Sequence, residues 1–116
     1  MAVHTLRGPY LLSRSKIESV VPAKSPGVFI LGRLNTRGTL NRVEVLGRSD
    51  FDLAAELRDH ARALVHQAFL FETASTALSA FEMECGLYHE FRLADFLHPE
   101  RPRHTAWKCP VCKHYP

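Results

Sequence analysis

No stretch of this sequence approaches the roughly 20 consecutive apolar residues that a membrane-spanning helix needs, because the apolar runs 28–31 and 68–71 are soon interrupted. The first twenty residues lack a continuous apolar stretch and a small-residue cleavage site, so no secretory signal is expected. Cysteine is scarce, and an odd count of three does not suit a fully paired disulfide framework. We therefore expect no membrane association, a cytoplasmic location and thiols that are free to bind metal.

An excess of charge of one sign is also missing. The formal net charge is +3 and the pI is near 9.0, which is compatible with a polyanionic partner such as DNA or RNA but does not require one. An apolar fraction of 46% and a charged fraction of 23% are close to the averages of globular proteins, which excludes wholesale disorder or a fibrous repeat. With 116 residues, the chain has material for one core.

Hydrophobic spacing and turn residues predict an α+β fold, with a small three-stranded antiparallel sheet flanked by helices in the order β-β-α-β-α. Residues 1–24 form an N-terminal extension and residues 25–116 form the domain. The expected elements are a short helix over 13–21, a hairpin with strands near 27–32 and 42–47, a helix from Asp50 or Asp52 to about 65, a strand over 68–71 and a helix from Ser75 or Thr76 to about 91.

The C-terminal tail beyond this last helix contains the strongest chemical motif. Cys109-Pro-Val-Cys112 has the spacing of a zinc knuckle, in which two thiolates approach one ion. Cys85 and His89 are four residues apart on the expected helix, so both side chains project from the same helix face. Together the four residues predict a closed Cys3His shell around a structural zinc ion, with no open position for a substrate.

Other interpretations of these residues stay open. Cys85 is also consistent with a buried core thiol, His89 with a surface residue, and the cysteine pair with a redox pair or an incidental match. The tail is rich in proline and has Trp107 as its strong apolar anchor, so a metal would supply order that the tail otherwise lacks. The identity of the histidine ligand is open as well, since three others lie close enough in the sequence to replace His89: His98, His104 and His114.

The order of elements and several short motifs resemble the GIY-YIG nuclease superfamily over about residues 25–95. Gly27-Val28-Phe29 stands at the first family motif, Val45-Leu46-Gly47 at the second, and Ala80 to Glu84 has the alanine-to-glutamate spacing of the later family helix. The chain is similar more closely to a small zinc-binding prokaryotic subgroup. The segments that carry this similarity are 26–33, 47–50, 84–89, 98–99 and 107–112.

The resemblance implies a metal-dependent cleavage of phosphodiester bonds, in which paired tyrosines and an arginine act with a glutamate that holds Mg²⁺. Glu84 stands at the metal-ligand position of this family. Phe29 and Val45 stand where the two tyrosines are expected, and Glu56 stands where the helix arginine is expected. A carboxylate repels the phosphate that a guanidinium would bind, so the catalytic set is eroded.

Residues that could replace the lost catalytic groups are Arg48 and Arg58 as cations and His60 as a base, together with Glu84 as a Mg²⁺ ligand. Asp95 stands near the late asparagine of the family. Residues of these types are more often solvated surface residues or, in the case of His60, a helix-end residue hydrogen-bonded to backbone.

Three functions follow from these observations. The favoured one is a non-catalytic zinc module whose first partner to test is nucleic acid, with phosphate contacts from four arginines: Arg33, Arg37, Arg42 and Arg48. The first alternative is an endonuclease, a hydrolase that uses Mg²⁺ at Glu84. The second alternative is a protein-interaction or inhibitor module that binds a protein partner through the tail and Trp107. The sequence leaves the oligomeric state undetermined.

Overall fold

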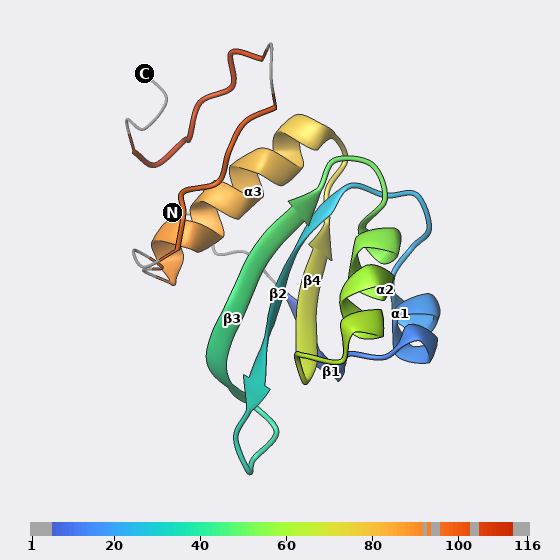
Figure 1. The fold of residues 1–116 in the computed structure, drawn as a ribbon. Coiled ribbons are helices and arrows are strands. Elements are labelled where there is room, and N and C mark those ends of the chain that lie inside the picture. Colours follow the sequence, from blue (N-terminus) through green and yellow to red (C-terminus); the bar gives the residue numbers. More distant parts are fainter. Residues whose placement is uncertain (1–5, 92, 94–95, 103–104, 113–116) are drawn as a thin grey trace.

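The structure is a computed structural model and describes residues 6–91, 93, 96–102 and 105–112. It has an α+β fold in which a four-stranded antiparallel sheet lies between helices (Figure 1). In chain order the elements are β1 (Arg7–Leu11), α1 (Arg14–Val20), β2 (Gly27–Leu34), β3 (Leu40–Ser49), α2 (Leu53–Ala63), β4 (Ala68–Thr73) and α3 (Ala77–Glu90).

The sheet has the strand order β1-β4-β2-β3, so the prediction of three strands was wrong by one. The additional strand, β1, lies in the segment that the sequence marked as an extension, and it pairs antiparallel with β4. Gly8 and Pro9 lie inside it, and both residue types are depleted in strands. Proline is tolerated on an edge strand because the missing N–H group is not needed for a second neighbour.

Helices cover both faces of the sheet, with α1 and α2 on one side and α3 on the other (Figure 1). Neighbouring side chains of the central strand β2 point to opposite faces, which explains why its apolar run is continuous. Phe29 and Leu31 join the core under α1 and α2 with Leu57 and Phe71. On the face toward α3, the packed and fully buried side chains include Val28, Ile30, Phe81, Cys85 and Leu87.

The three helices begin beside the residues at which the sequence predicted their starts. The side-chain oxygens of Ser13, Asp52 and Thr76 accept the backbone N–H three residues later at 3.2, 3.2 and 3.0 Å. These contacts confirm the expected helix starts and select Asp52 over Asp50. Within the ranges described, no helix is long and apolar enough to cross a bilayer.

The outer strand β3 contains a β-bulge in its pairing with β2. Leu31 is paired with Val45 but the next residue, Gly32, is paired with Val43, which leaves Glu44 as the extra residue on β3. A bulge bends the strand and redirects the side chains around it. Glu44 consequently reaches the loop between α2 and β4, where His66 hydrogen-bonds to its carboxylate at 2.8 Å.

Gly47 provides a test of the packing between β3 and β2. It lies opposite Phe29, and a Cβ atom at this position would lie 2.5 Å from Cζ of the Phe29 ring. Because Phe29 is almost fully buried, the ring has little room to move, and we expect Gly47→Ala to lower the free energy of unfolding by about 1–3 kcal/mol. Urea unfolding followed by circular dichroism measures this loss.

The matched control is the same substitution in a Phe29→Leu background. Leucine does not extend to the position of Cζ, so the cost of Gly47→Ala should shrink there. An equal cost in both backgrounds would mean that the ring contact is not the cause.

Candidate metal centre

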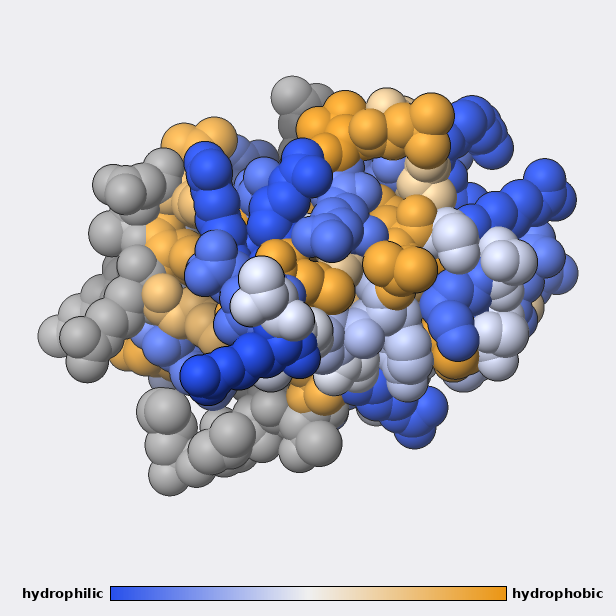
Figure 2. Space-filling view, turned by 90° about the horizontal axis from the view of Figure 1, so that it is seen from below, coloured by the Kyte–Doolittle hydropathy of each residue, from blue (hydrophilic) through white to orange (hydrophobic). Residues whose placement is uncertain are grey.

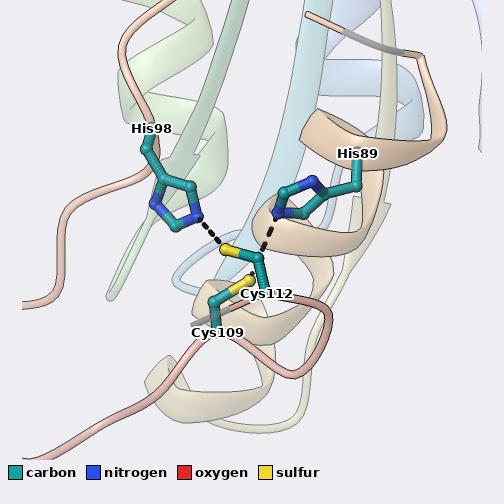
Figure 3. Close-up of side chains that lie close together, drawn as sticks. All are labelled: His89, His98, Cys109 and Cys112. Carbon is teal, nitrogen blue, oxygen red and sulfur yellow. Dashed lines mark hydrogen bonds between the residues drawn. The ribbon is translucent and has the colours of Figure 1, made fainter. Parts of the chain in front are cut away.

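Four side chains from α3 and the C-terminal tail converge on one point (Figure 3). His89 comes from the last turn of α3, while His98, Cys109 and Cys112 come from the segment that follows it. Their ligand atoms all lie within 4.8 Å of one another. The Nε2 atom of His89 is 3.5 Å from Sγ of Cys109, and the Nε2 atom of His98 is 3.3 Å from Sγ of Cys112. This His2Cys2 cluster can hold a metal ion.

The turn between the two cysteines favours the thiolate form of Cys109. Burial opposes ionisation of this thiol, but backbone N–H groups of Cys112 and Val111 donate to the sulfur, and the Cys112 side chain contributes as well. Together these hydrogen bonds hold the pKa of Cys109 below its usual value. Since the thiolate is the form of cysteine that binds metal, the knuckle prepares this ligand before an ion arrives.

The two histidines are oriented by their neighbours. The Nδ1 atom of His98 is 2.9 Å from the backbone oxygen of Pro99. A proton on Nδ1 satisfies this contact and leaves the lone pair on Nε2, the nitrogen that faces the cluster. The Tyr88 ring lies edge-on against both imidazoles, with ring centroids 5.1 Å from each of His89 and His98. Tyr88 also donates a hydrogen bond to the Phe96 backbone oxygen at 3.2 Å, which fixes the ring.

Cys85 does not belong to the cluster, so the predicted Cys3His set is wrong at this residue. His98 is the fourth ligand in its place. The Cys85 thiol is fully buried beside Cys109 and Phe81 in an apolar cluster that Trp107 covers. Burial, followed by the neighbouring Cys109 sulfur, raises the pKa of Cys85. His89, Cys109 and Cys112 come together as expected. His104 and His114, the other alternative ligands, lie outside the described residues.

Arg48 and Glu84, two of the four catalytic candidates, form an ion pair between β3 and α3. The Nη1 atom of Arg48 is 2.7 Å from Oε1 of Glu84, and its Nε atom is 2.8 Å from Oδ1 of Asp50. The guanidinium carbon also lies 5.1 Å from the centroid of the Phe81 ring. Both carboxylates thus neutralise this cation, and Glu84 is only 7% exposed.

The protonation of this pair reflects burial as well as attraction. Burial lowers the pKa of Arg48, but hydrogen bonds to Asp50 and Glu84 outweigh it and the pKa is raised. Burial raises the pKa of Glu84, and Arg48 offsets this effect only in part because Asp50 shares the guanidinium and repels the second carboxylate. The pair is therefore a buried structural contact, in which burial disfavours the charged form of the Glu84 carboxylate.

Arg58 and His60, the other two catalytic candidates, belong to α2 on the opposite side of the sheet (Figure 1). The His60 ring packs against Phe29 with centroids 5.4 Å apart, and Arg58 lines a pocket beside α1. Of the four catalytic candidates, the structure brings Arg48 and Glu84 together and places Arg58 and His60 on the other side of the sheet. Asp95 lies outside the described residues.

The four arginines expected to contact nucleic acid differ in their surroundings. Arg48 is held as described above. Arg33 is paired with Glu44, with Nε 3.3 Å from Oε2, and donates to the backbone oxygen of Val65 at 2.7 Å. Arg37 and Arg42 are exposed on the hairpin.

Two features escaped the sequence analysis. The first is that His98 joins the cluster together with His89, whereas the sequence offered it only as a replacement for His89. The second is the contact between His66 and Glu44, which depends on a bulge that no sequence pattern marked. Comparisons with models of protein families, with curated proteins and with solved structures gave no match, so the cluster is argued from its geometry.

Metal content tests the cluster directly. We expect the purified protein to bind one equivalent of Zn²⁺, and removal by a chelator to lower the melting temperature by at least about 10 °C, because binding stabilises the folded state. Elemental analysis and calorimetry with and without chelator measure the two quantities. Identical melting curves with and without the ion would exclude a folding role.

Substitutions separate the ligands from the buried thiol beside them. His98→Ala and Cys112→Ala should each weaken zinc binding by more than about 100-fold, since each removes one of four donors. Cys85→Ala is the matched control and should retain the full equivalent. Retention in His98→Ala combined with loss in Cys85→Ala would instead favour the Cys3His set.

The raised pKa of Glu84 predicts a pH-dependent contribution to stability. The unfolded carboxyl titrates near 4.5, and the folded carboxyl titrates at higher pH. In the window above pH 4.5 the folded state binds more protons than the unfolded state, so the free energy of unfolding falls as the pH rises. The difference between the wild-type protein and Glu84→Gln should decline across this window in urea titrations. A difference that grows with pH would contradict the burial effect.

Proposed function

We propose that this chain is a non-catalytic α+β binding module, stabilised by a structural zinc ion, whose partner is nucleic acid. The observation that carries the proposal is the convergence of His89, His98, Cys109 and Cys112. Two thiolates and two imidazoles are a donor set that suits zinc, and four protein ligands complete a tetrahedral shell. Such a shell leaves no position for an activated water, so the ion serves the fold.

The absence of catalysis is supported by the state of the candidate catalytic groups. Phe29 has no phenol, and Val45 packs against the apolar core. Glu84 and Arg48 already neutralise each other, and opening their contact would leave a buried carboxylate without its partner. A phosphate or Mg²⁺ ion would have to compete with this internal pair.

The nucleic-acid partner is supported by charge. The chain has a formal net charge of +3, and Arg37 and Arg42 are exposed on the hairpin. Arginine binds phosphate in a bidentate manner, which makes it the residue of choice for this contact. A nucleic-acid partner is also what the resemblance to the GIY-YIG nuclease superfamily would imply.

One observation favours a second candidate, a Mg²⁺-dependent endonuclease. Arg48 and Glu84, a cation and a carboxylate from distant parts of the chain, meet at one point. If substrate binding separated them, Glu84 would be able to hold the ion and Arg48 the phosphate.

A nicking assay decides between the two functions. We expect the zinc-loaded protein to leave supercoiled plasmid intact in the presence of Mg²⁺ or Mn²⁺, because removal of single groups from a cooperative active site already costs orders of magnitude in rate. Gel electrophoresis resolves supercoiled, nicked and linear forms.

Glu84→Ala provides the control for this assay. Nicking by the wild-type protein that disappears in Glu84→Ala would establish the endonuclease and overturn the non-catalytic proposal. Nicking that is equal in both proteins would identify a contaminating nuclease.

A further inference from the structure

A pocket of about 430 Å³ lies between α1 and α2, on the side of the molecule away from the metal centre. Residues from the start of α1 and from one face of α2 line it: Leu12, Ser13, Arg14, Arg58, Ala61, Arg62 and Leu64. On the side where α1 and α2 lie, the right of Figure 2, hydrophilic side chains project beside smaller apolar areas. The lining therefore combines three apolar side chains, of which Leu64 is 88% exposed at the rim, with three guanidinium groups.

The three guanidinium groups are accessible to a ligand. Arg14 is paired with Glu18 at 2.9 Å and Arg62 with Asp59 at 3.7 Å, but the arginine side chains are 80% and 79% exposed. Water screens such surface pairs, so they are weak and can open. Within the part of the chain that the structure describes, Arg58 has no hydrogen bond or ion pair. The pKa of Glu18 is lowered mainly by Arg14 and to a smaller extent by the charge of Arg58.

The chemistry of the lining matches a nucleotide better than a carboxylate. Each guanidinium presents a planar fork of N–H donors that fits phosphate oxygens, and its flat face stacks on a base. Leu12, Ala61 and Leu64 offer apolar surface for the ring. Ser13 accepts the Lys16 backbone N–H at 3.2 Å and its oxygen lies 3.5 Å from the Ser15 hydroxyl, so its hydroxyl proton can turn from that weak contact to the ligand.

We propose that this pocket binds one nucleotide of a single-stranded nucleic acid, with the phosphate at Arg58 and Arg62 and the base against the apolar side chains of the lining. The proposal rests on the nucleic-acid partner proposed above and adds a contact at α1 and α2 to the contact at the hairpin arginines. The pocket volume is in the range of small-ligand sites and accommodates one base and its sugar phosphate. A base that is stacked within a duplex cannot enter, so single strands are preferred. An acidic peptide would satisfy the arginines but has no ring for the apolar side chains.

The test uses the zinc-loaded full chain and a fluorescein-labelled oligothymidylate, with binding followed by fluorescence anisotropy over a range of salt concentrations. Arg58→Gln combined with Arg62→Gln should weaken binding at least about tenfold, because charge-assisted hydrogen bonds are lost. The magnitude of the slope of log affinity against log salt should fall by about 0.7, because both arginines contact the same phosphate and one phosphate contact on a single strand is lost.

The comparison variant is Arg37→Gln combined with Arg42→Gln, which removes the same charge from the hairpin and should weaken binding less than the pocket variant does. If the hairpin variant loses binding and the pocket variant does not, the pocket assignment fails while nucleic-acid binding stands. If the wild-type protein binds no oligonucleotide even at low salt, the nucleic-acid partner itself fails. Melting temperatures of both variants confirm that they are folded.

Two further probes identify what the pocket recognises. Adenosine monophosphate should shift the amide resonances of Ser13, Ala61 and Leu64 in NMR spectra, whereas inorganic phosphate alone should shift them less. Polyglutamate should not displace the oligothymidylate. Displacement by polyglutamate at equal charge concentration would make the pocket a site for acidic protein segments and would overturn the proposal.

Discussion

The C-terminal segment is held in position by side chains of α3, and the candidate metal centre and the apolar cluster around Cys85 both depend on this contact. Residues 96–102 and 105–112 contain no helix or strand, so regular backbone pairing does not hold them. They are anchored by the four donors of the metal centre and by the Trp107 ring, which packs on Phe81 with centroids 5.7 Å apart. A metal ion bound there would be coordinated by all four side chains. The free energy of binding would offset the conformational entropy that the C-terminal segment loses on folding.

The same helix connects this anchor to the sheet. Phe81 contacts Trp107 on the side of the tail and lies under the Arg48 guanidinium on the side of β3. The ion pair between Arg48 and Glu84 spans the same boundary. Both residues were catalytic candidates in the sequence analysis, and in the structure they contribute to holding α3 against the sheet.

Much of the fold was predictable because local signals determine it, and the remainder depends on contacts that are distant in the sequence. Ser13, Asp52 and Thr76 are capping residues whose role depends on the next three residues alone. The strand β1 was missed because its stability comes from β4, almost sixty residues away, and not from its own composition. In the metal site, helical spacing correctly placed Cys85 and His89 on one face. It could not show that Cys85 lies deeper in the core, or that an irregular tail would bring His98 to the cluster.

The bulge at Glu44 has a consequence for the solubility of the chain. The strand β3 is ten residues long and lies at the open edge of the sheet, where unpaired N–H and C=O groups can recruit a strand from another molecule. The extra residue interrupts the even spacing of these groups, and the charged contacts of Glu44 with Arg33 and His66 occupy the same stretch. A strand from another molecule would meet a break in register at this point, and bulges of this kind are one way in which natural sheets discourage pairing at an open edge.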